Sequence, residues 1–449
     1  MSSHRIAAAL ALFFLSLPGR GGAEVAPAPY TTRSPAADRV AARPVYVEPQ
    51  ERFEFGVESR TRCERRRYDY TTQDLLVDDA LVTRNLLYVD WRPRSERFGL
   101  VAEIDDSRRF FSEREVNPNI ENDLEPIQVY GQVRFDDFAG GERLTLAVGR
   151  MTFDWVDRRL FARNRNRNTI NSFQGIRLNL GEEHSPWEVE AIALRPVERS
   201  VDSFDEASDS VLIAGLAGYL RGHSPHFLLE PYWLCFDEDT SVPADERRSY
   251  HHFGLHAYGL IGDDTGWDYD FGLITQSGSK GGRSHLAWAA HAELGHTWET
   301  SWRPRLSGWM NYASGDRDPD NQRSGRFDPL FGATYTFYGF GSFFSLENLV
   351  NPALRLSFSP TETLRCEIFH RGYWLASERD AWVRGLRIDP GGASGRFIGQ
   401  ETDLRLVWQA RERLELDLAC ALFLPGDFVS ATGSDPVASF VQLAATLVF

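Results

Sequence analysis

The strongest constraint on the fold is an alternation of apolar and polar residues with period two, repeated in segments of about ten residues. In residues 413–424 every second residue is Leu or Cys, whereas Arg413, Glu415 and Asp417 begin the other face. Successive side chains of a β-strand point to opposite faces, so the pattern predicts strands with one apolar and one polar face. Long amphipathic helical patterns are almost absent.

Eighteen segments show this alternation, and turn signals such as Ala139-Gly140-Gly141 and Gly262-Asp263-Asp264 separate them. The segments cover residues 53–64, 80–92, 97–105, 127–136, 142–151, 173–180, 187–195, 210–221, 226–236, 250–261, 267–277, 285–298, 302–314, 352–359, 363–374, 398–408, 413–424 and 438–448. Short turns alternate with longer polar stretches between them. The spacing therefore predicts an all-β fold of about 18 antiparallel strands built from hairpins.

A soluble β-sandwich would also alternate, but two features favour a transmembrane barrel. The polar faces are densely charged on strand after strand, as the lining of a water-filled lumen would be. Aromatic residues gather near strand ends, as at Trp91, Tyr232, Trp302 and Trp408, which is typical of interfacial girdles. The last strand also ends on Phe449, as in bacterial outer-membrane proteins. Because strands in lipid need every backbone hydrogen bond satisfied, the sequence predicts a closed antiparallel transmembrane β-barrel.

Composition narrows the class further. The 449 residues carry a formal charge of −15, and lysine occurs once, at Lys280, so arginine supplies nearly all of the 49 basic groups. No apolar run approaches the ~18–20 residues that a spanning helix needs, which excludes a helical membrane protein. The acidic balance disfavours a nucleic-acid partner. Taken as a sum, the charge disfavours an anionic partner as well, but permeation responds to the local field at the constriction and not to the sum.

The N-terminus predicts export. A polar start at His4 and Arg5, an apolar stretch over 6–17 and a small-residue exit ending at Ala23 are typical of a secretory signal peptide; the alternative is a buried N-terminal helix. We therefore expect a signal peptide over 1–23, a flexible Pro/Ala-rich segment over 24–50 and the barrel over 51–449, in the bacterial outer membrane.

Metal and disulfide signals are weak. The four cysteines are far apart without a metal-like spacing, and we interpret them as packing residues. The histidines at 251, 252, 291 and 296 have no third ligand at a recognisable spacing. Asp316, Asp318 and Asp320 resemble the start of a calcium loop, but the glycine at position six and the glutamate at position twelve are missing. We expect no cofactor and no metal, with calcium as the weak alternative.

Three ordered sets of residues carry a family resemblance. Residues 145–177 contain Thr145-Leu146-Ala147-Val148-Gly149-Arg150, Asp157-Arg158-Arg159 and Asn171-Ser172-Phe173-Gln174-Gly175-Ile176-Arg177. Residues 315–331 run from Gly315-Asp316 through Asp320-Asn321 to Phe327-Asp328-Pro329-Leu330-Phe331. Residues 399–426 contain Gly399-Gln400-Glu401-Thr402-Asp403 and Leu424-Pro425-Gly426. The set resembles the alginate export family of outer-membrane porins, over essentially residues 52–449.

The resemblance implies an 18-stranded, monomeric barrel whose arginine-lined constriction passes an anionic polysaccharide. The candidate pore residues come from the polar faces and from the family motifs. They are Arg60, Arg62, Glu103, Asp105, Arg108, Arg150, Arg158, Arg159, Arg177, Glu401, Asp403 and Arg405. Strict alternation would aim Arg150 outward, so either a bulge re-aims it or it lies at the membrane interface.

Residues 154–171 form the most informative connection, with Arg163, Arg165 and Arg167 separated by asparagines. Two interpretations stay open: a loop that folds into the lumen and polarises the pore, or an extracellular loop that contacts lipopolysaccharide phosphates. Acids on neighbouring strands, such as Asp403 and Asp417, are expected to pair with lumenal arginines across the sheet.

The sequence thus predicts a passive channel for an anionic, alginate-like polyuronate or a related anionic saccharide. A porin for sugars or small organic anions is the alternative. A barrel enzyme is a third class, for which Ser249, His251 and Asp263 are candidates by composition alone. Expected partners are the anionic solute, outer-membrane lipid and lipopolysaccharide, and periplasmic export proteins.

Overall fold

The computed structural model describes residues 52–449 except 94–96, 183–184, 223, 264 and 319–320. The predicted signal peptide and Pro/Ala-rich segment lie outside the described residues. Eighteen long strands dominate this part of the chain. They are β1 (Arg52–Asp69), β2 (Asp74–Arg92), β3 (Phe98–Phe110), β4 (Asn122–Ala139), β5 (Glu142–Met151), β6 (Phe173–Leu180), β7 (Trp187–Glu198), β9 (Val211–Leu220), β10 (Leu228–Glu238), β11 (Arg248–Ile261), β12 (Trp267–Lys280), β13 (Arg283–Thr297), β14 (Arg305–Ala313), β16 (Leu349–Thr361), β17 (Leu364–Leu375), β18 (Phe397–Arg411), β19 (Leu414–Pro425) and β20 (Ala438–Val448).

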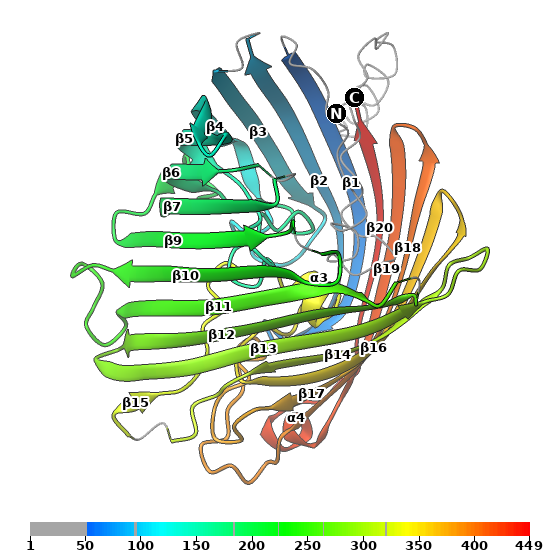
Figure 1. Cartoon of the computed structure of the whole chain (residues 1–449). Helices are drawn as coiled ribbons and strands as arrows, with labels where there is room; N and C mark the ends of the chain where they lie inside the picture. The colour runs from blue at the N-terminus through cyan, green and yellow to red at the C-terminus, as the bar shows by residue number, and fades with distance from the viewer. Residues whose placement is uncertain (1–51, 94–96, 183–184, 223, 264, 319–320) are drawn as a thin grey trace.

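The strands close into a single barrel (Figure 1). Each long strand pairs antiparallel with its neighbour in the chain, and β1 pairs with β20, so that Arg60 lies opposite Arg84 on one side and Thr446 on the other. Every one of the 18 predicted segments overlaps one of these strands. The predicted all-β, closed antiparallel barrel is therefore confirmed.

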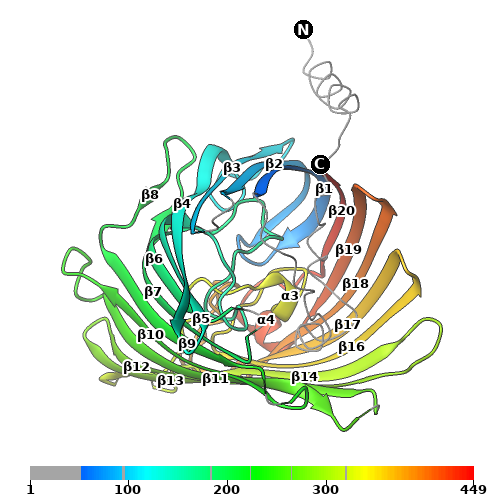
Figure 2. The ribbon, with the colours of Figure 1, turned by 45° about the horizontal axis from the view of Figure 1, so that its top comes forward.

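The two ends of the barrel differ. Short turns such as 140–141, 362–363 and 412–413 lie at the end that carries the C-terminus, whereas most connections at the other end are long. The long loops hold the short strands β8 (Glu206–Ala207) and β15 (Arg323–Ser324) and the helices α3 (Tyr335–Tyr338) and α4 (Asp427–Thr432). Figure 2 looks into the barrel and shows loop segments and α3 inside the ring of strands.

The outer face is an apolar belt. Exposed side chains such as Leu286, Leu216 and Leu443 alternate with buried neighbours along their strands. Trp91, Trp302 and Trp408 are exposed near the short turns, where an interfacial girdle is expected. Tyr232 was expected in such a girdle, but it is buried inside the barrel against Trp155, with ring centroids 5.3 Å apart. Among the described residues no helix is long and apolar enough to cross a membrane.

Candidate functional site: the arginine-lined lumen

The lumen contains a cavity of about 2660 Å³ between the barrel wall and the loops that fold inward. Counted over the described residues, sixteen arginines and Lys280 line it, against fourteen aspartates and glutamates. The lining is therefore slightly basic, although the whole chain carries a charge of −15. This difference arises because the lining arginines lie at inward-facing strand positions and on several loops that fold inward.

The connection between β5 and β6, residues 152–172, is one of these loops, and we call it the arginine loop. Wall arginines hold its backbone: Arg60 Nη1 and Arg84 Nη1 each donate to the carbonyl oxygen of Arg165 at 2.8 Å, and Arg62 Nη1 donates to that of Asn166 at 2.7 Å. Because the wall binds the carbonyls, the side chain of Arg165 stays free to project into the cavity. The structure thus places this loop in the lumen.

Side-chain contacts fix the same loop at two further points. Arg163 Nη2 lies 2.6 Å from Glu103 Oε1 on β3, which makes a buried ion pair. The side chain of Asn168 is buried and donates to the carbonyl oxygens of Thr83 at 3.0 Å and Ile120 at 2.8 Å. Ion pairs and buried amide bonds of this kind oppose movement of the loop into the pore axis.

The connection between β14 and β16, residues 314–348, meets the arginine loop across the lumen; we call it the aromatic loop. Main-chain bonds join the two loops, with Phe331 N donating to Leu160 O at 2.9 Å and Ala333 N donating to the carbonyl of Arg158 at 3.0 Å. Arg159 Nη1 donates to the hydroxyl of Tyr338 at 3.1 Å and lies 4.3 Å from the ring centroid of Phe337. The two loops therefore form one packed unit inside the barrel.

Five arginines that line the cavity have no carboxylate within 4.0 Å among the described residues: Arg158, Arg165, Arg167, Arg199 and Arg384. All five lie on loops. Burial, together with the charges of Arg199 and Arg384, lowers the pKa of Arg167 well below its ordinary value. The lowered pKa means that nearby groups do not compensate the positive charge of Arg167. An anion entering the cavity would supply the missing compensation.

The wall beneath them carries paired charges. Arg371 Nε lies 3.0 Å from Asp403 Oδ2, and Arg405 Nε lies 3.0 Å from Asp417 Oδ1, as the expected cross-strand pairing requires. Arg177 Nε lies 2.5 Å from Glu190 Oε1, and its guanidinium lies 5.0 Å from the ring of Phe153. These pairs fix the wall arginines in place, and Arg177 and Arg405 still reach the cavity.

The predicted pore residues fall into three groups. Arg62, Arg158, Arg159, Arg177 and Arg405 line the cavity. Arg60, Glu103, Asp105, Glu401 and Asp403 point inward but lie behind the loops, where they are buried and bond to loop or wall atoms. Arg108 and Arg150 do not line the cavity.

Arg108 and Arg150 do not line the cavity because they occupy outward-facing positions in the alternation of their strands. Arg108 alternates with the inward-facing Ser107 and Arg109, and on the outer face it pairs with Asp106 at 2.8 Å and Asp123 at 3.1 Å. Arg150 keeps the outward parity of Val148 without a bulge and pairs with Glu125 at 2.6 Å. The structure thus corrects the expectation that these two arginines face the pore.

The calcium alternative gains no support. Asp320 lies outside the described residues. Asp316 Oδ2 lies 3.4 Å from Arg283, and Asp318 Oδ1 lies 3.8 Å from Arg379, so arginines take the charge that calcium would take.

The three residues named as candidates for an enzyme site do not lie together. Ser249 lies at the start of β11, whereas Asp263 lies in the turn after its end, 3.0 Å from His226. His251 is exposed and stacks on Trp233 with ring centroids 6.0 Å apart. The three residues therefore form no catalytic triad.

Sequence reasoning missed several residues. Arg199 and Arg384 lie in long loops, where no periodicity tells which way a side chain points. Arg84 shares parity with the inward face of its predicted segment and could have been found there. His256 and Asp270 come together with His291 on three neighbouring strands, and only the strand register reveals it.

Several solved structures share this architecture, among them the outer membrane protein opdK from Pseudomonas aeruginosa. OccK3 (OpdO) from Pseudomonas aeruginosa is 14% identical with a TM-score of 0.62, covering 90% of this chain and 97% of its own. OccAB3 from Acinetobacter baumannii is 12% identical with a TM-score of 0.62, covering 88% and 99%. OccK2 (OpdF) from Pseudomonas aeruginosa in complex with glucuronate is 13% identical with a TM-score of 0.60, covering 88% and 96%. None of the curated proteins compared with the chain matches it.

The closed 18-strand barrel, its apolar belt and its charged lumen define an outer-membrane channel protein of a bacterium. The model of the alginate export family matches residues 51–440, and the chain belongs to that family. By the rule for such barrels, the short turns face the periplasm and the long loops face outward.

Proposed function

We propose that this channel passes an anionic saccharide, with an alginate-like polyuronate as the favoured substrate, through the arginine-lined cavity. The observation that carries the proposal is the set of five cavity arginines without a carboxylate partner, Arg158, Arg165, Arg167, Arg199 and Arg384. A polyuronate presents one carboxylate per sugar. Its charge is complementary to these guanidinium groups, which never lose their own charge at physiological pH.

The arrangement of the arginines suits the passage of a solute better than its tight retention. A conducting pore needs contacts favourable enough to replace hydration but weak enough to release the solute at each step. The five arginines are spread over three loops and offer several such contacts in succession. The paired wall arginines, such as Arg405 with Asp417, are already neutralised and add little further attraction.

Aromatic rings accompany the arginines. The guanidinium of Arg158 lies 5.4 Å from the ring centroid of Phe337, and that of Arg159 lies 4.3 Å from the same ring. A ring face below a guanidinium holds its plane in one orientation. The fork of Arg158 is thereby oriented for bidentate contact with a carboxylate, which favours a recognised anion over general diffusion.

A small anionic saccharide is the second candidate. The glucuronate complex of OccK2 (OpdF) shows that a protein of this fold binds a single uronate. A channel for monomers and a channel for polymers would share the arginine chemistry. We further propose a monomeric, non-enzymatic pore, with lipopolysaccharide and periplasmic export proteins as its other partners.

Planar-bilayer conductance distinguishes these candidates. We expect anion selectivity, and we expect micromolar polymannuronate to reduce the current while neutral dextran of similar length does not. Block by glucuronate without block by the polymer would favour the small-solute channel. Cation selectivity of the unmodified protein would contradict both.

A further inference from the structure

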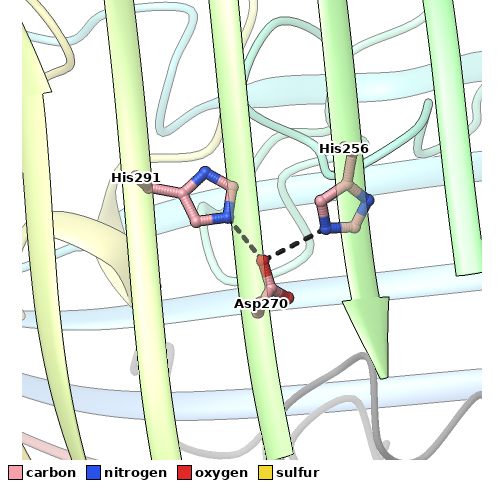
Figure 3. Close-up of side chains that lie close together, drawn as sticks. All are labelled: His256, Asp270 and His291. Carbon is pink, nitrogen blue, oxygen red and sulfur yellow. Dashed lines mark hydrogen bonds and ion pairs between the residues drawn. The ribbon is translucent and has the colours of Figure 1, made fainter. Parts of the chain in front are cut away.

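Three neighbouring strands place two histidines and an aspartate together on the inner face of the wall. In the register of the sheet, His256 on β11 lies opposite Gly272 on β12, and Gly272 lies opposite His291 on β13. Asp270 precedes Gly272 by two residues and therefore points to the same face. Figure 3 shows both imidazole rings turned towards the Asp270 carboxylate.

Gly272 makes this arrangement possible. A Cβ atom at this position would lie 2.4 Å from Cε1 and 2.5 Å from Nδ1 of His291. Any side chain there would push the ring of His291 away. The glycine thus leaves the space between the two rings open, with Asp270 reaching into it.

The ligand atoms are close enough for one metal ion. His256 Nε2 lies 3.1 Å from Asp270 Oδ1, His291 Nε2 lies 2.5 Å from the same oxygen, and the three atoms lie within 4.8 Å of one another. Zinc binds nitrogen and oxygen ligands at about 2.0–2.2 Å, so its ligand atoms stand about 3.3 Å apart. Reaching that spacing takes His291 Nε2 about 0.8 Å farther from Asp270 Oδ1 and brings the two ring nitrogens, which lie within 4.8 Å, closer together. All three residues are buried, which holds the donor set in place.

A carboxylate lies beside the Nδ1 atom of each ring, within hydrogen-bond distance at His256 and farther away at His291. His256 Nδ1 lies 2.8 Å from Glu230 Oε2, and Tyr258 donates to Glu230 Oε1 at 3.0 Å. His291 Nδ1 lies 3.8 Å from Asp157 Oδ2 on the arginine loop. The bond to Glu230 keeps the proton of His256 on Nδ1 and leaves its Nε2 lone pair for a metal, as in carboxylate–histidine–zinc sites.

The local charge balance also suits a cation. Asp157, Glu230 and Asp270 bring three negative charges, and Arg159, whose Nε lies 3.2 Å from Asp157, brings one positive charge. Two neutral histidines add none. A divalent ion would balance the remainder.

We propose that His256, Asp270 and His291 bind one divalent transition-metal ion of the zinc type in the barrel wall. Two histidines and a carboxylate are a ligand set that such ions use with a position left open. All three residues line the same cavity as Arg158, so the open position faces the lumen. The ion would add two positive charges to the wall and tie the root of the arginine loop to it through Asp157. The site does not depend on the identity of the permeant.

The test is metal binding to the full-length, tag-free barrel in detergent after chelator treatment. Zinc titrated against a chromophoric chelator should show one tight site per chain, and Co²⁺ should give the visible bands of a four- or five-coordinate site. His256→Ala and His291→Ala should each weaken zinc binding by at least about 100-fold. His251→Ala is the matched control, because His251 lies on the same strand but on the outer face, and it should bind zinc as the parent does.

Two further variants keep the test valid if an alanine variant fails to fold. Glu230→Gln should weaken zinc binding by about 10- to 100-fold, because Glu230 orients His256 through Nδ1 and is not itself a ligand. Gly272→Ala should also weaken it through displacement of His291. Folding is checked by heat-modifiable mobility on gels. The proposal is overturned if the folded parent takes up no zinc, or if uptake is the same in His291→Ala.

Discussion

Arg60 on β1 donates from Nη1 to the main-chain carbonyl oxygen of Arg165 at 2.8 Å, so one arginine of the wall holds the backbone that carries another into the lumen. The contact uses a charged donor on a neutral acceptor. The positive charge of Arg60 is therefore kept in the lumen and not cancelled. Arg62 and Arg84 make the same kind of contact with the same loop.

Removing the hydrogen bonds of Arg60 should loosen the arginine loop. In Arg60→Ala the loop loses charge-assisted bonds to the carbonyls of Arg165 and Arg167, worth about 2 kcal/mol to the docked state. Single-channel recordings should then show loop excursions about 30-fold more often. Arg65→Ala is the control, because Arg65 is exposed on the outer face of the same strand, 3.7 Å from Asp79. Unchanged current noise in Arg60→Ala would show that the loop is held elsewhere.

Charge reversal of an uncompensated arginine should change selectivity. At about 5 Å in water, two units of charge change the energy of a permeant anion by about 1.7 kcal/mol. Arg158→Glu should therefore lower the anion-to-cation permeability ratio by at least about tenfold, read from reversal potentials in a salt gradient. The same change at Arg177, which already pairs with Glu190, tests a wall position in the same cavity. Arg65→Glu, with the same total charge change on the outer face, should leave the ratio nearly unaltered.

The buried pair of Arg371 and Asp403 should matter for stability. Both side chains are fully buried, and Arg371 also donates to the carbonyl oxygen of Phe337 in α3 at 3.2 Å. Arg371→Met leaves Asp403 as an uncompensated buried charge and should lower the free energy of unfolding by about 3–5 kcal/mol. Urea unfolding in lipid vesicles measures it. Arg303→Met, at an exposed pair with Glu299, should cost less than about 1 kcal/mol.

Asp328 should make docking of the aromatic loop sensitive to acid. Burial opposes the charge of Asp328, but Arg248 and Lys280 outweigh it and lower the pKa of this carboxyl. A lowered pKa in the folded state means that the stabilisation is complete above the ordinary carboxyl pKa and is lost as the pH falls through the folded value. We expect loop gating to increase below about pH 4. In Asp328→Asn this gating should already be present at pH 5 and change little on further acidification.

Two opposed glycines should tolerate no side chain. Gly149 and Gly175 face each other between β5 and β6, with φ of 140° and 156°. A Cβ atom at Gly175 would lie 2.1 Å from the carbonyl oxygen of Ala193. Gly175→Ala should destabilise the barrel by more than about 2 kcal/mol. Gly131→Ala is the control in the same unfolding assay, because the nearest atom to its Cβ would be 3.7 Å away.

Period-two alternation determined most of the fold without the structure. Backbone geometry forces alternate side chains to opposite faces, so the same pattern located the strands and gave the inward parity of Arg60, Arg62 and Glu103. It also gave the outward parity of Arg150, which the structure keeps. The error at Arg108 came from setting aside this parity, since Arg108 alternates with Asp105 and Ser107.

Only the tertiary structure decided what the loops do. The backbone of Arg165 is bound by Arg60 of the wall, whereas the side chains of Arg199 and Arg384 donate to the carbonyl oxygens of Pro118 and Ser342. These contacts join residues 42 to 105 positions apart. The meeting of His256, Asp270 and His291 depends on the register of three strands, which the sequence of each strand leaves open. Alternation relates residues only a few positions apart, so the sequence alone determines it. The charge of the lumen arises from long-range contacts that form only when the barrel closes.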